Sequence, residues 1–283
     1  VLCGRKSERE KFAGAVATYG MEAMMKDGKS LQAGTTHYLG DNFARAFDIK
    51  FLDKDGTHKY AYQASWGIST RLIGAIIMAH GDERGLCLPP EVAPIQVVIV
   101  PIAAAKNPHV VEKARALADT LRERDLRVEL VERDLSPGFK FNHWELRGVP
   151  LRIEVGPRDL ERGMVMTCRR DTGDKLELPI DSCEMTVSAY LEDIADNMLA
   201  RAKAFTESHI VAVKDMAELS AALDGGNFAD AYWCGDRECE DKIKQEYAAT
   251  SRVFHSDQKG ATTHKCVCCG KKSKHRIYFA RAY

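Results

Sequence analysis

Apolar residues recur at helical spacing in the segment between Trp66 and Pro90. This periodicity predicts a helix that is buried along most of its surface. Gly67 and Ser69 are suited to the start of the helix, and the glycines and prolines after residue 80 are suited to ending it. Arg71 would then project near the helix N-terminus, where the backbone dipole favours an anion. The apolar positions are Ile68, Leu72, Ile73, Ile76 and Ile77.

Arg71 carries a planar fork of donors that matches phosphate oxygens, which suggests a polyphosphate ligand at this helix. An arginine taken alone more often pairs with a buried carboxylate, and the glycines around it would then be ordinary turn residues. The helix pattern by itself leaves both interpretations open.

Short apolar runs alternate with helical patterns in the middle of the chain. Residues 96–102 are apolar on both faces, as in a central parallel strand. A helical pattern over 109–124 and a strand over 126–131 complete a strand–helix–strand unit. Further elements are expected at 139–146 (helix), 151–155 and 163–169 (strands), and 185–206 (helix).

The two ends of the chain carry further elements. In the first part, residues 31–47 predict a polar strand followed by an amphipathic helix, residues 59–66 a strand, and residues 21–25 a strand or a short helix. In the last part, a strand at 210–213 precedes a helix at 216–223. We therefore expect a multidomain α+β and α/β protein with domains at 1–94, 95–206 and 207–283.

The composition is ordinary for a globular protein of 283 residues, with 45% hydrophobic and 29% charged positions. Because 41 basic and 41 acidic residues cancel, any RNA contact must come from local clusters of charge. No apolar run approaches the ~20 residues that span a bilayer, so we expect a cytoplasmic protein with no membrane partner.

Nine cysteines in a chain without a secretory signal argue against a disulfide framework. Four of them form a C-x₄-C pair, Cys234 and Cys239, and a later pair that begins at Cys266. Thiolates at this spacing suit a closed, structural Zn²⁺ site, although four unliganded thiols are the alternative. The last ligand is Cys268 or Cys269, and the glycine after Cys269 favours the latter.

Gln32, Thr35 and His37 lie on one extended segment. Their side chains would share a pocket if a bulge interrupts the strand near Gly34, and otherwise they are ordinary polar groups on a sheet surface.

The segment from Trp66 to Pro90 resembles motif 3 of the class II aminoacyl-tRNA synthetases. Its run His-Gly-Asp-x-x-Gly-Leu-x-Leu-Pro-Pro is similar to prolyl-tRNA synthetases of the archaeal and eukaryotic-like type, as is Gln-Ala-Gly-Thr-Thr-His-Tyr-Leu-Gly-Asp-Asn-Phe from Gln32. The resemblance implies part of an antiparallel catalytic domain at 1–94, which includes motif 3. It further implies an anticodon-binding α/β domain with a mixed sheet at 95–206 and a small α/β zinc-binding domain at 207–283.

The resemblance also implies site residues. ATP would contact Gln32, Thr35, Ser69 and Arg71. Proline would contact Phe12, His37, Trp66 and Gly67, with Arg71 and His37 as the catalytic pair. One departure concerns the pocket wall, since the stretch after Lys-Phe-Ala-Gly lacks the threonine-rich sequence of the relatives.

Carboxylates and arginines are frequent in the stretch from Trp144 to Asp159. Such groups can read base edges, although the same mixture is usual on a solvated, salt-bridged surface. The resemblance places four residues at the anticodon: Glu145, Arg152, Arg158 and Asp159. Arg170 and Lys175 are weaker candidates, for contact with the RNA backbone phosphate.

The implied reaction joins proline to tRNA(Pro) through prolyl-adenylate, with ATP and Mg²⁺ supplying the activated phosphate. The chain begins at Val1 and shows neither motif 1 nor motif 2, so we expect a C-terminal portion that is incomplete by itself and dimerises through the missing part. A non-catalytic tRNA-binding adaptor derived from a synthetase tail is the alternative. The terminal Tyr283 resembles the family's last residue, and we expect an ordered, docked C-terminus.

Overall fold

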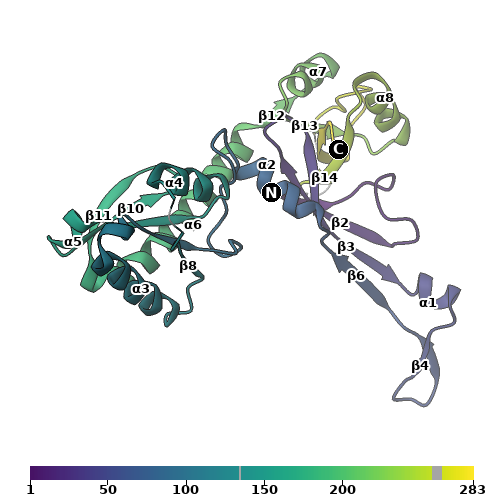
Figure 1. Ribbon diagram of the computed structural model, residues 1–283. Coiled ribbons are helices and arrows are strands. Elements are labelled where there is room, and N and C mark those ends of the chain that lie inside the picture. The colour runs from purple at the N-terminus through teal and green to yellow at the C-terminus, as the bar shows by residue number, and fades with distance from the viewer. Residues whose placement is uncertain (134, 257–262) are drawn as a thin grey trace. The chain divides into compact units, whose positions relative to one another are not determined.

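The computed structural model describes residues 1–133, 135–256 and 263–283, and their contacts group into two compact units (Figure 1). Unit 1 combines the two ends of the chain, Val1–Ala75 and Lys203–Tyr283, whereas unit 2 consists of Ile76–Ala202. The domain boundaries at 94 and 206 therefore remain a prediction. Each unit is described by itself.

The first sheet of unit 1 is antiparallel throughout, in the strand order β1-β2-β3-β6. A two-stranded ribbon extends beyond it (Figure 1). The strand expected at 59–66 is interrupted at Ala61 and Tyr62, where one strand of the ribbon ends before β6 begins. The elements are β1 (Leu2–Arg5), β2 (Ala17–Met24), β3 (Ser30–Gly40), α1 (Asn42–Ala46), β4 (Lys50–Leu52), β5 (His58–Tyr60), β6 (Gln63–Gly67) and α2 (Arg71–His80).

The second sheet of unit 1 is built from the end of the chain, in the order β12-β13-β15-β14. Its core is apolar and includes Trp233, Ile277 and Phe279. The two sheets of unit 1 meet closely, since a β carbon on Gly4 would lie 2.1 Å from the carbonyl oxygen of Phe254. The elements are β12 (Ile210–Val213), α7 (Met216–Asp224), β13 (Phe228–Trp233), α8 (Arg237–Tyr247), β14 (Thr250–Phe254) and β15 (His275–Ala280).

Unit 2 contains the expected strand–helix–strand unit and a five-stranded mixed sheet, in the order β11-β10-β9-β7-β8. The central strand β7 pairs in parallel with β8 and β9, while β10 pairs antiparallel with β9 and β11. The elements are β7 (Val97–Pro101), η1 (Ala104–Lys106), α3 (Pro108–Arg122), β8 (Val128–Leu130), α4 (Pro137–Leu146), β9 (Leu151–Val155), α5 (Pro157–Leu160), β10 (Met164–Arg169), β11 (Lys175–Pro179), η2 (Ile180–Ser182) and α6 (Cys183–Ser208).

The faces of the unit 2 sheet are covered unequally. Apolar residues of α3 and α6 pack on one face of β7, β9 and β10, and this burial forms the main core. On the opposite face, Trp144 of α4 packs against Val98 and Val100 of β7. On that face Arg152 and Glu154 of β9 are partly buried, with side chains 11% and 13% exposed.

The expectation of a mostly buried motif 3 helix is wrong for the described residues. Only Ala75 of α2 is buried, whereas Ile68 and Ile73 are 70% and 64% exposed. Periodicity identifies the apolar face of a helix, but the covering element must come from elsewhere in the fold.

Candidate functional site

A β-bulge brings the predicted nucleotide-binding residues onto one face of the first sheet. Gly34 pairs with Met21 and Gln32 pairs with Glu22, so Ala33 is an extra residue on β3. This confirms the expected irregularity near Gly34. Because side chains directly opposite in a sheet share a face, Gln32 points to the same side as two further residues of β3, Thr35 and His37.

His37 is held between two hydroxyl groups on this face. Its Nδ1 lies 3.0 Å from Oγ1 of Thr18, and its Nε2 lies 3.2 Å from Oγ1 of Thr35. The ring of Phe12 lies 4.7 Å from the imidazole, centroid to centroid. Two hydrogen bonds fix the imidazole plane, and the pair of rings forms a flat wall suited to a small apolar ligand.

Arg71 reaches β3 beside this group from the start of α2. Its Nη1 donates to the backbone oxygen of Gln32 at 3.4 Å, and its backbone N–H donates to Oγ of Ser69 at 3.3 Å. The guanidinium has no carboxylate partner in the part of the chain that the structure describes. The structure therefore brings together Phe12 and five other predicted residues: Gln32, Thr35, His37, Ser69 and Arg71.

Trp66 is not part of this group. It pairs with Thr36 in the register of β3 and β6, so its side chain lies on the face opposite His37, where it is 75% exposed. Gly67 pairs with Thr35 and lies on the expected side, with open space where a side chain would stand. The strand alternation thus separates two neighbours that the resemblance assigns to one pocket.

A buried charge network supports Gln32, and sequence reasoning missed it. Lys6 donates to Oε1 of Gln32 at 2.7 Å and lies 3.3 Å from Oε1 of Glu22. Glu22 is fully buried and also accepts from Arg252 of β14 at 2.7 Å and from Ser30 at 3.0 Å. The only sequence signal was a glutamate at an inward position of an otherwise alternating strand.

Replacing Arg252 with methionine should lower the free energy of unfolding by about 3–5 kcal/mol. The reason is that Glu22 would keep only one cationic partner, and an undercompensated buried carboxylate is strongly destabilising. Chemical denaturation measures the loss, with Arg237→Met as the control, because Arg237 is 79% exposed. The double variant Arg252→Met/Glu22→Gln should recover part of the lost free energy of unfolding. A loss below about 1 kcal/mol in Arg252→Met would contradict the role of the network.

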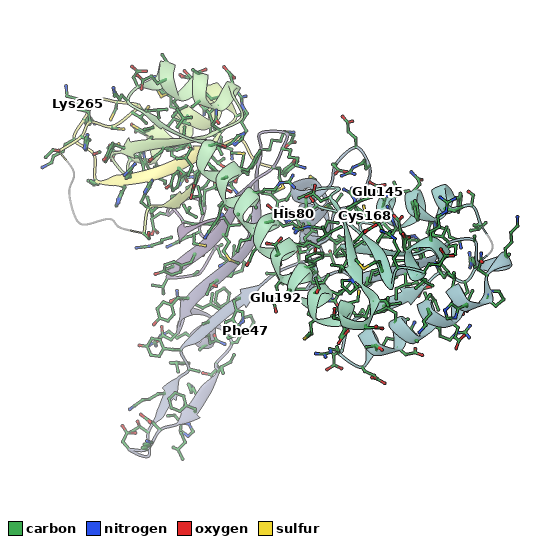
Figure 2. All side chains as sticks on the ribbon, turned by 90° about the vertical axis from the view of Figure 1, so that its left-hand side faces the viewer. Phe47, His80, Glu145, Cys168, Glu192 and Lys265 are labelled. Carbon is green, nitrogen blue, oxygen red and sulfur yellow. The ribbon has the colours of Figure 1, made fainter. Side chains whose placement is uncertain are left out.

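The predicted anticodon residue of β9, Arg152, lies on the α4 side of the unit 2 sheet. Arg152 and Lys175 flank Cys168 (labelled in Figure 2) in one cross-strand row. Arg152 lies beneath the ring of Phe141, 4.1 Å from its centroid, and donates to Glu154 at 2.9 Å. This row offers donors, an acceptor and an aromatic ring, the groups that recognise unstacked bases. Sequence reasoning missed Phe141 and Glu154.

Glu145 and Arg170 lie beside this face but differ in availability. Glu145 (labelled in Figure 2) is partly exposed and accepts from Arg84 at 2.8 Å. Arg170 is buried and donates to both oxygens of Asp82 and to the backbone oxygens of Glu145 and Gly85. Its hydrogen bonds lower the pKa of Asp82 to about 2. These contacts give Arg170 a structural role in place of the predicted RNA contact.

Arg158 and Asp159 lie apart from Arg152, in α5 beyond the other end of β9. Asp159 accepts from Arg162 at 3.0 Å. Arg158 is exposed and has no hydrogen-bond or ion-pair partner among the described residues. The predicted anticodon set therefore lies at both ends of β9.

Four cysteines of unit 1 have the geometry of a tetrahedral metal site. Their sulfurs lie within 4.8 Å of one another, with 3.6 Å between Cys234 and Cys239 and 3.8 Å between Cys234 and Cys269. A tetrahedron of ~2.3 Å metal–sulfur bonds requires sulfurs ~3.8 Å apart. The grouping includes Cys269, as the following glycine suggested, and Gly270 adopts a φ of 71°. The fourth member is Cys266.

Burial raises the pKa of the Cys234 thiol to about 12 and also raises that of Cys239, while a backbone N–H lowers that of Cys269. Metal binding must therefore release protons, and affinity for a metal should increase with pH. These four residues could bind a metal ion.

The end of the chain docks against the start of β3. Ser30 donates to the backbone oxygen of Arg281 at 2.8 Å, and Ala282 forms a bridge with Ser30. The N–H of Tyr283 donates to Ser30 at 3.4 Å, although its side chain is 61% exposed. This confirms an ordered terminus, two residues from Gln32 in the strand.

Comparison with known proteins agrees with these geometries. Residues 216–283 match the family described as prolyl-tRNA synthetase, C-terminal, and residues 96–190 match the anticodon binding domain. The chain is 50% identical to the proline–tRNA ligases of Symbiobacterium thermophilum and Alkaliphilus oremlandii and 48% identical to that of Oceanobacillus iheyensis, over 99–100% of its own length. It spans 59% of the length of each relative. The chain belongs to the prolyl-tRNA synthetase family.

Proposed function

We propose that this chain forms the motif 3 side of a proline-activating site and the anticodon-reading part of a proline–tRNA ligase. The observation that carries the proposal is the single sheet face on which Phe12, His37 and Gln32 converge, with Arg71 beside Gln32. In this arrangement Arg71 and Gln32 would hold ATP, while His37 and Phe12 would frame the proline ring. The archaeal and eukaryotic-like type is the more specific form of this proposal.

The contribution of these side chains is positioning and charge neutralisation. The proline carboxylate attacks the α-phosphate of ATP and pyrophosphate leaves. A hydroxyl at the 3′ end of tRNA(Pro) then takes the prolyl group from the adenylate, and AMP leaves. Together with Mg²⁺, Arg71 would stabilise the negative charge that moves among the phosphate oxygens during the reaction. Neither step requires a covalent bond to a side chain, which fits a reaction that depends on orientation.

The test is proline-dependent ATP–pyrophosphate exchange by the full-length parent protein. Exchange that requires proline and is absent with alanine or threonine supports the proposal, and absence of exchange with proline refutes it. Binding of tRNA(Pro) without any exchange would instead identify a non-catalytic adaptor. The adaptor is not favoured, because relatives that match the whole chain are named proline–tRNA ligase.

The four-cysteine cluster is proposed to bind a structural Zn²⁺, since a closed set of thiolates leaves no coordination position for a substrate. The described residues contain no helix long and apolar enough to cross a membrane. A cytoplasmic homodimer remains part of the proposal.

Arg158→Ala should raise the KM for tRNA(Pro) in aminoacylation about tenfold while proline activation stays within twofold. Arg158 is exposed and free of protein partners among the described residues, so its donors are available to a base or a phosphate. Steady-state aminoacylation and exchange assays separate the two effects, with the exposed Arg124 changed to alanine as the control. If activation fell in parallel, Arg158 would support the fold and not the RNA contact.

A further inference from the structure

Thr18 of β2 is a buried threonine whose hydroxyl group joins two residues of the candidate site. The residue is only 1% exposed. Its Oγ1 accepts a hydrogen bond from the backbone N–H of Phe12 at 3.0 Å and lies 3.0 Å from Nδ1 of His37. One oxygen therefore contacts the main chain of the phenylalanine and the ring of the histidine, the two members of the flat wall.

Two arrangements of protons are compatible with the distance between Thr18 and His37. Either the hydroxyl donates to Nδ1, or a protonated Nδ1 donates to the hydroxyl oxygen. In the second arrangement the oxygen accepts from both Phe12 and His37, and the hydroxyl proton has no acceptor in the described part of the chain. A buried donor without an acceptor costs more free energy than a single hydrogen bond contributes. The burial of Thr18 therefore favours the arrangement in which Nδ1 accepts.

This choice at Nδ1 decides the direction of the next hydrogen bond. A ring that accepts through Nδ1 carries its proton on Nε2, which lies 3.2 Å from Oγ1 of Thr35. The N–H of His37 then donates to that oxygen, and the hydroxyl proton of Thr35 remains available to another acceptor. Thr35 is partly exposed, and its hydroxyl has no second partner among residues 1–133, 135–256 and 263–283. An acceptor from a bound substrate can therefore take this proton.

We propose that Thr18 is a positioning residue, which fixes the tautomer of His37 and thereby makes the hydroxyl of Thr35 a donor to an anionic oxygen of the substrate. In the opposite tautomer Thr35 would donate to Nε2 and present only lone pairs to the substrate, which would repel an anion.

The inference rests on the proposed function for the identity of the substrate. The anionic oxygen belongs either to the triphosphate of ATP or to the carboxylate of proline. The direction of the hydrogen bonds depends only on Thr18, His37 and Thr35, and it can be measured without a substrate.

The first test locates the ring proton of His37 by nitrogen NMR of the full-length parent protein with isotope-labelled histidine rings. His37→Gln identifies the signals of this residue by their loss. In the wild type the proton should be on Nε2. In Thr18→Val a population with the proton on Nδ1 should appear, because valine supplies no donor, whereas Thr18→Ser should retain the wild-type tautomer. A proton on Nδ1 in the wild type would overturn the proposal.

The second test measures proline-dependent ATP–pyrophosphate exchange. Thr18→Val should lower kcat/KM about tenfold, the effect of one hydrogen bond, and Thr18→Ser should stay within about twofold of the wild type. Thr36→Val is the matched control, because Thr36 is exposed on the opposite face of β3, and it should leave exchange unchanged. A higher KM for ATP alone would assign the anionic oxygen to the triphosphate, and a higher KM for proline alone would assign it to the carboxylate.

A double-variant cycle separates positioning from general support of the fold. If Thr18 acts through Thr35, most of the loss caused by Thr18→Val should disappear when Thr35→Val is already present. Additive losses would overturn the proposal, as would wild-type exchange in Thr18→Val. A wild type without proline-dependent exchange would refute the proposed function alone, since the NMR measurement still determines the tautomer.

Discussion

Arg71→Ala in the full-length enzyme should slow proline-dependent ATP–pyrophosphate exchange by about 10²–10³-fold. The guanidinium lies beside Gln32, and its hydrogen bond among the described residues is a long one, 3.4 Å, to the backbone oxygen of Gln32. Removal of a single donor that stabilises developing charge has an effect of this size in other enzymes. The loss should appear mainly in the rate of exchange, because the phosphates require the charge most strongly in the transition state.

The fold should survive this substitution, because Arg71 is exposed and makes no ion pair with the described residues. Circular dichroism and the thermal midpoint provide that check, and Arg45→Ala gives a matched exposed arginine in the same unit. Arg71→Lys should recover only part of the rate, since an ammonium lacks the planar fork. Exchange at the wild-type rate in Arg71→Ala would remove the main support for the nucleotide site.

Loss of the metal cluster should have the largest effect on stability. Cys239→Ser should abolish metal binding and unfold the sheet formed by β12 to β15, because structural zinc sites contribute about 10–16 kcal/mol of apparent binding free energy at neutral pH. The wild type should contain one zinc per chain by elemental analysis. A chelator should lower its thermal midpoint, and more readily at lower pH, where the thiols regain protons.

Two cysteine variants decide the membership of the cluster. Cys269→Ser should lose the metal, whereas Cys268→Ser should keep it, since only Cys269 belongs to the group of sulfurs within 4.8 Å. Cys3→Ser serves as the control, because Cys3 is exposed and lies outside the cluster. Wild-type protein without metal, folded and insensitive to chelator, would show that the thiols pack without a ligand.

Local patterns along the chain predicted most elements of unit 2. The apolar run before Ile102 became β7, and the helical pattern over 109–124 became α3 within two residues at each end. These elements form their core with neighbours in sequence, so their periodicity contains nearly all the information that their folding requires.

The C-terminal sheet was harder to predict, because its strands pair across long separations. Strand β15 inserts between β13 and β14, and no local pattern in the sequence predicts that strand order. The same limit applies to α2, whose apolar face was evident although its exposure was not. Periodicity reports which side of an element is apolar, and topology decides what covers it.

The sequence predicted residues of the candidate site but not the buried residues that support them. Gln32 and His37 were identified by resemblance, and the bulge that aligns them was expected from a glycine. Lys6 and Arg252 were not identified, because a buried ion pair between residues 230 positions apart, such as Glu22 and Arg252, leaves no mark in local sequence. Trp66 was assigned to the same pocket as its neighbour in sequence, but consecutive residues of a strand point to opposite faces of the sheet.

The distance between Glu22 and Arg252 in the chain has a consequence for synthesis on the ribosome. At ~5–20 residues per second, about 10–50 s pass between the emergence of the carboxylate and that of its partner. Unit 2 is completely synthesised during this interval, whereas unit 1 still lacks its final strands. The amino-terminal sheet of the nascent chain therefore remains incompletely folded, and chaperone protection would matter most during this interval.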